Sequence, residues 1–219
     1  MGDFFNIENP VWQVIEKIAD IVILSFLYAL LCFPLITIGP ATAALYYTIV
    51  KVVRRERGYV LTEFFRSFKM NFKTGLLSTI IILGASYILW ADYTFAFDYY
   101  KKNSLLAIFM ISVFVILTIA LAFTVLYIFP VLSRFTIKGR QLFKTSFFMS
   151  LRHFATTMMH LVILAMAIYL LYRSPVGCFF IPGVTCLIIS FRMEEILKRY
   201  TPEEEVNEDG TPKDQWYLE

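Results

Sequence analysis

The chain has 219 residues, of which 58% are apolar and 17% are charged, and its mean hydropathy is +0.66. These values exclude an ordinary soluble domain and predict a protein surrounded by membrane lipids. The formal charge of +3 is uneven, because residues 200–219 hold seven acids and one base while the remaining body holds nineteen bases and ten acids. A cationic body is usual beside an anionic membrane leaflet, so nucleic acid is not expected as a partner.

Asn9 and Pro10 suit the cap and the first position of a helix whose apolar face would lie in the membrane interface. Uncharged runs then predict the spans, since a helix needs roughly 20 apolar residues to cross the hydrocarbon core. The runs are residues 21–50, 74–91 with an extension to 97, 103–133, 153–172 and 174–191.

The first run is too long for one straight span, and prolines interrupt it at Pro34 and Pro40. We predict a helix that ends at Cys32, a non-helical turn through residues 37–40, and a shorter helix from Ala41. The expected fold is therefore all-α, a polytopic transmembrane bundle of five spans plus a half-helix, or of six spans.

Two segments between the runs are amphipathic, residues 61–73 and 143–154, with phenylalanines on one stripe and bases on another. They predict two cytoplasmic helices that lie on the membrane surface. Each follows a Phe-Pro pair, at 33–34 and 129–130. This similarity predicts a degenerate repeat, 20–97 and 104–172, within a transmembrane domain of residues 1–199 that precedes an acidic, flexible tail of residues 200–219.

Sixteen of the twenty bases fall in residues 51–73, in residues 134–152 and after residue 191. The positive-inside rule places these segments and the carboxyl terminus in the cytoplasm, and residues 92–102 and the turn at Arg173 outside. The side of the amino terminus depends on whether the helix from Ala41 crosses the membrane.

The sequence contains no GxxxxGK[ST], HExxH or GxSxG motif and only two histidines, so we expect no enzyme, no metal site and no cofactor. No Asp, Glu, Lys or Arg lies deep in any run, which argues against an ion-coupled transporter. Cys32, Cys178 and Cys186 stand alone in apolar segments and are expected to pack there. His160 is expected to face the bundle or the interface.

Two sets of residues are candidate sites. The first surrounds the interrupted run and could either contact a ligand or form a close packing seam; these seam residues are Thr37, Gly39, Pro40, Thr42, Tyr46 and Tyr47. The second could contact lipid phosphates or an acidic partner; it comprises Arg54, Arg55, Arg57, Arg66, Lys69, Lys73, Lys144 and Arg152. In the tail, Trp216, Tyr217 and Leu218 are a candidate docking peptide.

Several of these segments occur together in a known family. They read NP at 9–10, KIAD at 17–20, PLITIGPATAALYY at 34–47, RGY at 57–59 and FFRSFKMNFK at 64–73. In this combination, over about residues 9–80, the chain resembles the YesL family of bacterial membrane proteins. That family is a domain of unknown function whose genes often neighbour carbohydrate ABC importers, glycan-responsive two-component systems and glycoside hydrolases.

The resemblance implies a non-enzymatic accessory protein of the bacterial plasma membrane. It would associate with the permease or ATPase subunits of a carbohydrate ABC importer and aid glycan uptake or its regulation. Two other functions stay open at this point. The interrupted run could bind or pass a lipid or a small neutral solute, or the chain could be a membrane sensor of carbohydrate utilisation that uses its acidic tail.

Overall fold

A computed structural model describes residues 10–100, 104–135, 137 and 139–201, and within them the chain forms seven α-helices and no strand. Short 3-10 or π segments, labelled η, join some of them. The elements are α1 (Pro10–Cys32), η2 (Leu35–Thr37), α2 (Ile38–Thr48), η3 (Ile49–Arg54), α3 (Val60–Tyr100), α4 (Ser104–Arg134), α5 (Arg140–Arg152), α6 (Phe154–Arg173), η4 (Pro175–Phe179) and α7 (Ile181–Lys198). The all-α prediction is confirmed.

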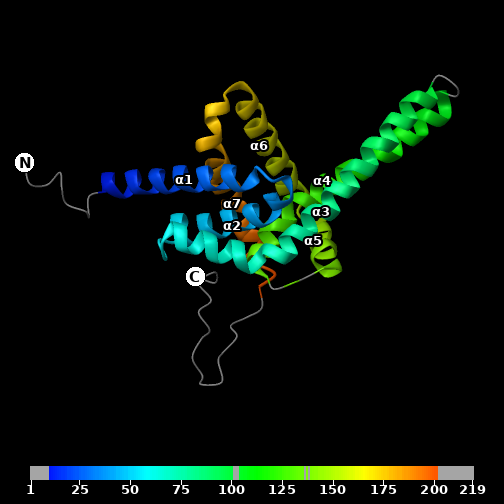
Figure 1. Ribbon diagram of the computed structural model, residues 1–219. Helices are drawn as coiled ribbons and strands as arrows, with labels where there is room; N and C mark the ends of the chain where they lie inside the picture. The colour runs from blue at the N-terminus through cyan, green and yellow to red at the C-terminus, as the bar shows by residue number, and fades with distance from the viewer. Residues whose placement is uncertain (1–9, 101–103, 136, 138, 202–219) are drawn as a thin grey trace, which may run out of the picture.

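The helices form a central body with two projecting hairpins (Figure 1). The distal parts of α3 and α4 run side by side away from the body as one long hairpin, held in part by Tyr93, whose hydroxyl lies 3.3 Å from that of Thr118. The second hairpin consists of α6 and the chain that returns through η4 to α7. Their exposed surface is largely apolar, as expected for helices that contact lipid.

Four stretches in the described part of the chain are long and apolar enough to cross a membrane: Leu35–Arg54, Val60–Tyr100, Ser104–Arg134 and Phe154–Arg173. This is fewer than the five or six spans expected from the sequence. The reason is that α1 and α7 contain charges within the helix itself, such as Asp20 and Glu194. The exact number of spans therefore stays a prediction.

The break in the first apolar run was predicted correctly at its beginning but not at its end. Helix α1 ends at Cys32 as predicted. The chain then bends at Phe33 and Pro34 and passes through the 3-10 turn η2, and α2 already begins at Ile38. Gly39 and Pro40 thus lie in the first helical turn instead of a non-helical one, and Pro40 is tolerated there because the first four N–H groups of a helix have no intrahelical acceptor. Pro10 is the first described residue and is already helical, so the predicted helix start there stays a prediction.

The first predicted surface helix is not a separate element. Residues 61–73 form the beginning of α3, a continuous helix of 41 residues, because no proline interrupts it. Where α3 lies against the body, its buried stripe is mainly small or polar, whereas Leu61, Phe65, Met70 and Phe72 are exposed. The buried residues of this part are Val60, Glu63, Phe64, Ser67, Asn71, Gly75, Ser78 and Thr79. Small residues that face neighbouring helices are typical of membrane bundles.

The two halves of the predicted repeat also differ at their Phe-Pro pairs. Pro130 lies inside α4, which continues to Arg134, so the expected break at 129–130 is absent. The segment after it does form a separate helix, α5, which ends at Arg152.

The middle of the body is the α2–η3 rod, which is buried along almost its whole length. One face of the rod, including Ala43 and Val50, packs with residues of α4, α5 and α7. The opposite face, including Ala44 and Ile49, packs with α1 and the start of α3. This rod therefore positions most of the polar groups described below.

Candidate functional site

Helices α2 and α3 cross at two glycines. A Cβ atom on Gly39 would lie 2.5 Å from the carbonyl oxygen of Gly75 and would also collide with Thr79 Oγ1. A Cβ atom on Gly75 would lie 2.8 Å from the nitrogen of Pro40. The two backbones are thus close enough to exclude any side chain at these positions, which is the geometry of a small-residue crossing in membrane proteins.

Glu194 of α7 is the centre of a buried polar cluster. Its carboxylate accepts a hydrogen bond from the Tyr46 hydroxyl at 2.8 Å and one from Arg134 Nη1 at 2.6 Å. Arg55 Nη2 lies 3.8 Å from the same carboxylate. The Glu194 and Arg134 side chains are only 6% and 3% exposed. Such a pair is tolerated because both charges have hydrogen-bond partners.

Two of the arginines expected to contact lipid phosphates or a partner instead contact α7. Arg54 Nη1 donates to the carbonyl oxygen of Ser190 at 2.9 Å, and its guanidinium lies over the Phe191 ring, 4.4 Å from the ring centroid. Arg55 belongs to the Glu194 cluster. Together they bind the end of η3 to the middle of α7. Arg57 lies just beyond, half-buried.

A second buried ion pair joins η3 to α3. Lys51 Nζ lies 2.9 Å from Glu63 Oε2, each side chain being 10% exposed, and donates to the Tyr47 hydroxyl at 3.3 Å. The pair and the Glu194 cluster lie at the same end of the α2–η3 rod. Both therefore fix the orientation of that end within the bundle.

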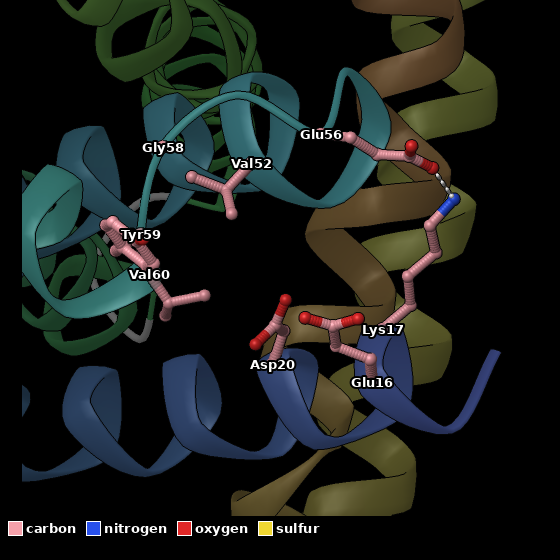
Figure 2. Close-up of a pocket in the computed structure, with 8 residues that line it drawn as sticks. All are labelled: Glu16, Lys17, Asp20, Val52, Glu56, Gly58, Tyr59 and Val60. Carbon is pink, nitrogen blue, oxygen red and sulfur yellow. Dashed lines mark ion pairs between the residues drawn. The ribbon is translucent and has the colours of Figure 1, made fainter. Parts of the chain in front are cut away.

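An acidic hollow of about 340 Å³ opens between α1, η3 and the start of α3 (Figure 2). Glu16 and Asp20 of α1 point into it, while Lys17 reaches across to Glu56 and pairs with its carboxylate at 2.6 Å. The remaining lining residues are Val52, Gly58, Tyr59 and Val60.

A basic hollow lies on the exposed face of the first part of α3. It is lined by Leu61, Thr62, Phe65, Arg66 and Lys69. Arg66 stays 66% exposed although its Nη1 approaches Glu63 at 3.9 Å. Lys73 is exposed one turn further along α3, and Lys144 and Arg152 are exposed on α5. Exposed bases are therefore present on both helices, and their role as a contact surface stays a prediction.

Comparison with known proteins finds matches to a family of unknown function. Residues 21–93 match the family model described as "Protein of unknown function, DUF624". Over 147 residues the chain is 29% identical to the uncharacterized protein YesL of Bacillus subtilis (strain 168), an alignment that covers 66% of this chain and 67% of that protein. These matches support membership of the YesL (DUF624) family. No solved structure matches it. The predicted resemblance is confirmed, and the region that matches the family model contains the Gly39–Gly75 crossing.

Two other seam residues, Thr37 and Thr42, make hydrogen bonds within their own segment of the chain. Thr37 Oγ1 donates to the carbonyl oxygens of Pro34, at 2.6 Å, and of Leu31. Thr42 Oγ1 donates to the Ile38 carbonyl oxygen at 2.7 Å. Neither hollow described above is lined by a seam residue. These contacts are those of a packing seam, and ligand binding there stays a prediction.

Four buried charges were missed from the sequence: Lys51, Glu63, Arg134 and Glu194. Three of them lie at or just beyond the end of an apolar run, and Glu63 lies in the amphipathic segment 61–73, so all four were read as facing water. One signal was available, because Glu194 lies between the apolar residues Met193 and Ile196–Leu197, which are themselves buried. Their partners, however, come from other helical elements, and only the folded chain reveals them.

His160 faces the interior of the bundle, which is one of the two positions predicted for it. It is fully buried on α6, and neither ring nitrogen has a hydrogen-bond partner among the described residues. Among the described residues, no Asp or Glu side chain forms a hydrogen bond or ion pair with His160, so a proton relay has no carboxylate partner there. No functional role follows from this arrangement.

Proposed function

We propose that the chain is a plasma-membrane protein of six spans, with both termini in the cytoplasm. The ion pair between Lys17 and Glu56 supports this topology, because it holds the beginning of α1 beside the end of η3. Helix α1 and the α2–η3 rod are therefore antiparallel. If the bases after residue 50 are cytoplasmic, the beginning of α1 is cytoplasmic too.

Cysteine labelling tests this topology. In a chain whose three native cysteines are replaced by alanine, Glu16→Cys and Thr62→Cys should react with a membrane-impermeant maleimide only after the cells are opened. Ser104→Cys, at the beginning of α4 beside the distal turn, should react in intact cells. Labelling of Glu16→Cys in intact cells would refute the six-span topology and favour five spans.

We propose that the protein is a non-enzymatic accessory of a carbohydrate ABC importer and associates with its permease or ATPase subunits. The observation that carries the proposal is the basic hollow, where Leu61 and Phe65 are 53% and 42% exposed beside Arg66 and Lys69. Exposed aromatic and basic groups side by side suit a protein interface better than a free aqueous surface. The identity of the partner rests on the family's gene neighbourhoods.

Affinity purification from native membranes in mild detergent tests the association. The tagged protein should recover permease or ATPase subunits in near-stoichiometric amount, and an Arg66→Ser/Lys69→Ser variant should recover several-fold less. Arg192→Ser is the matched control, since Arg192 is an exposed base on α7 that pairs with Glu195 at 3.2 Å. Recovery of the protein alone, under conditions that preserve importers, would overturn the proposal.

The two alternative functions have less support. A lipid or solute site at the seam would need a hollow beside Thr42 or Tyr46, and neither described hollow includes them. A sensor function relies on the acidic tail, of which residues 202–219 lie outside the described part of the chain. It stays a prediction that deletion of that tail would test through glycan-dependent expression.

A further inference from the structure

The basic hollow has a chemically matched segment in its own chain. It is a shallow surface of α3 lined by Leu61, Thr62 and Phe65 and by the bases Arg66 and Lys69. It thus combines a small apolar surface with positive charge on an exposed helix face. A complementary segment needs an aromatic or aliphatic group together with carboxylates.

Residues 202–219 lie outside the described residues, and their sequence has this composition. They contain seven acids against the single base Lys213, and the apolar triplet Trp216, Tyr217 and Leu218. We propose that this tail binds the basic hollow of the same chain, with the triplet against Leu61 and Phe65 and its acids beside Arg66 and Lys69.

The described contacts keep the hollow within reach of the tail. Ser190 of α7 bonds Arg54, and Lys51, one turn earlier on η3, pairs with Glu63 on the helix that carries the hollow. Along this path the end of α7 and the hollow are separated by about three helical turns and two interhelical distances, on the order of 40 Å at most. The fifteen Cα–Cα steps from Thr201 to Trp216 span about 50 Å when extended.

Two physical effects favour the tail over an anionic lipid surface as the occupant. The acids of the tail are repelled by anionic headgroups and attracted by the bases of the hollow. A segment tethered to its own target also binds at an effective concentration on the order of millimolar, so weak contacts suffice. The inference does not depend on an importer partner, although a partner that used the hollow would compete with the tail.

Carbodiimide cross-linking of the purified full-length protein tests the inference, because this reagent joins a lysine amine directly to a contacting carboxylate. The protein is placed in nanodiscs of phosphatidylcholine, and cross-linked peptides are identified by mass spectrometry. Lys69 should join tail carboxylates in the monomeric species several-fold more often than Lys144 does. Lys144 is a stringent control, since it is exposed on α5 and Arg152 of that helix lies over the ring of Tyr200 near the root of the tail.

Two variants keep the test decisive. Phe65→Ser and Trp216→Ser should each reduce the Lys69 cross-link several-fold, whereas Met70→Ser should not, because Met70 is exposed on the same helix but does not line the hollow. Equal yields at Lys69 and Lys144, adducts found only between two copies, or insensitivity to Trp216→Ser would overturn the inference. Loss of the cross-link when phosphatidylglycerol is added to the nanodiscs would assign the hollow to lipid instead.

Discussion

The hydroxyl of Tyr46 on α2 donates a hydrogen bond of 2.8 Å to the carboxylate of Glu194 on α7, across 148 positions of sequence. The same carboxylate accepts from Arg134 at the end of α4. One buried negative charge therefore joins three helices at the end of the bundle that we place toward the cytoplasm. Because little water reaches the site, loss of that charge leaves buried arginine uncompensated.

Glu194→Gln should lower the free energy of unfolding by about 3–5 kcal/mol, the usual cost of breaking a buried ion pair. Thermal or SDS-induced unfolding in mild detergent measures it. Glu195→Gln is the matched control. Glu195 is the next residue in the sequence, is exposed and pairs with the exposed Arg192, so its substitution should cost less than about 1 kcal/mol. Equal effects of the two substitutions would mean that the Glu194 cluster does not stabilise the fold.

The glycine crossing predicts a contrast within a single helix. Gly75→Ala should cost about 1–3 kcal/mol, because its Cβ would lie 2.8 Å from the backbone of Pro40 and the helices would have to separate. Gly84→Ala should be neutral or stabilising by about 0.5–1 kcal/mol, since no atom lies within 4 Å of a Cβ there. The same unfolding assay compares them, and a harmless Gly75→Ala would refute the close crossing.

The Lys51–Glu63 pair predicts non-additive substitutions. Lys51→Met alone leaves the buried Glu63 carboxylate without its 2.9 Å partner and should cost about 3–5 kcal/mol. The double variant Lys51→Met/Glu63→Gln should lose less stability than Lys51→Met, because neither charge remains. A double-mutant cycle measures the coupling between the two side chains. Additive losses would show that the two groups do not interact.

The helical class and the separate helix α5 followed from the sequence because they depend on local features. Apolar run length and the spacing of phenylalanines and bases in residues 143–154 act within a few residues. The continuity of α3 was also a local property, but the amphipathic stripe of residues 61–73 was mistaken for an independent element. The stripe faces outward from the bundle instead of marking a separate helix.

The polar interior could not be predicted in the same way. Glu63 and Glu194 resemble ordinary water-facing acids in sequence, and their burial depends on Lys51 and Arg134 arriving from other helices. Likewise, Arg54 and Arg55 were read as a surface cluster because positive charge after an apolar run usually faces lipid headgroups. Tertiary packing decides such cases, and a single sequence does not specify it.

Site-specific photo-cross-linking in native membranes tests most directly whether the basic hollow is where the protein meets an importer. A photoreactive phenylalanine analogue replaces Phe65, and a second chain carries it at Tyr87, which is exposed on the distal part of α3. The account predicts an adduct between position 65 and a permease or ATPase subunit that is absent at position 87. An adduct only with lipid at position 65, in cells that assemble the importer, would contradict it.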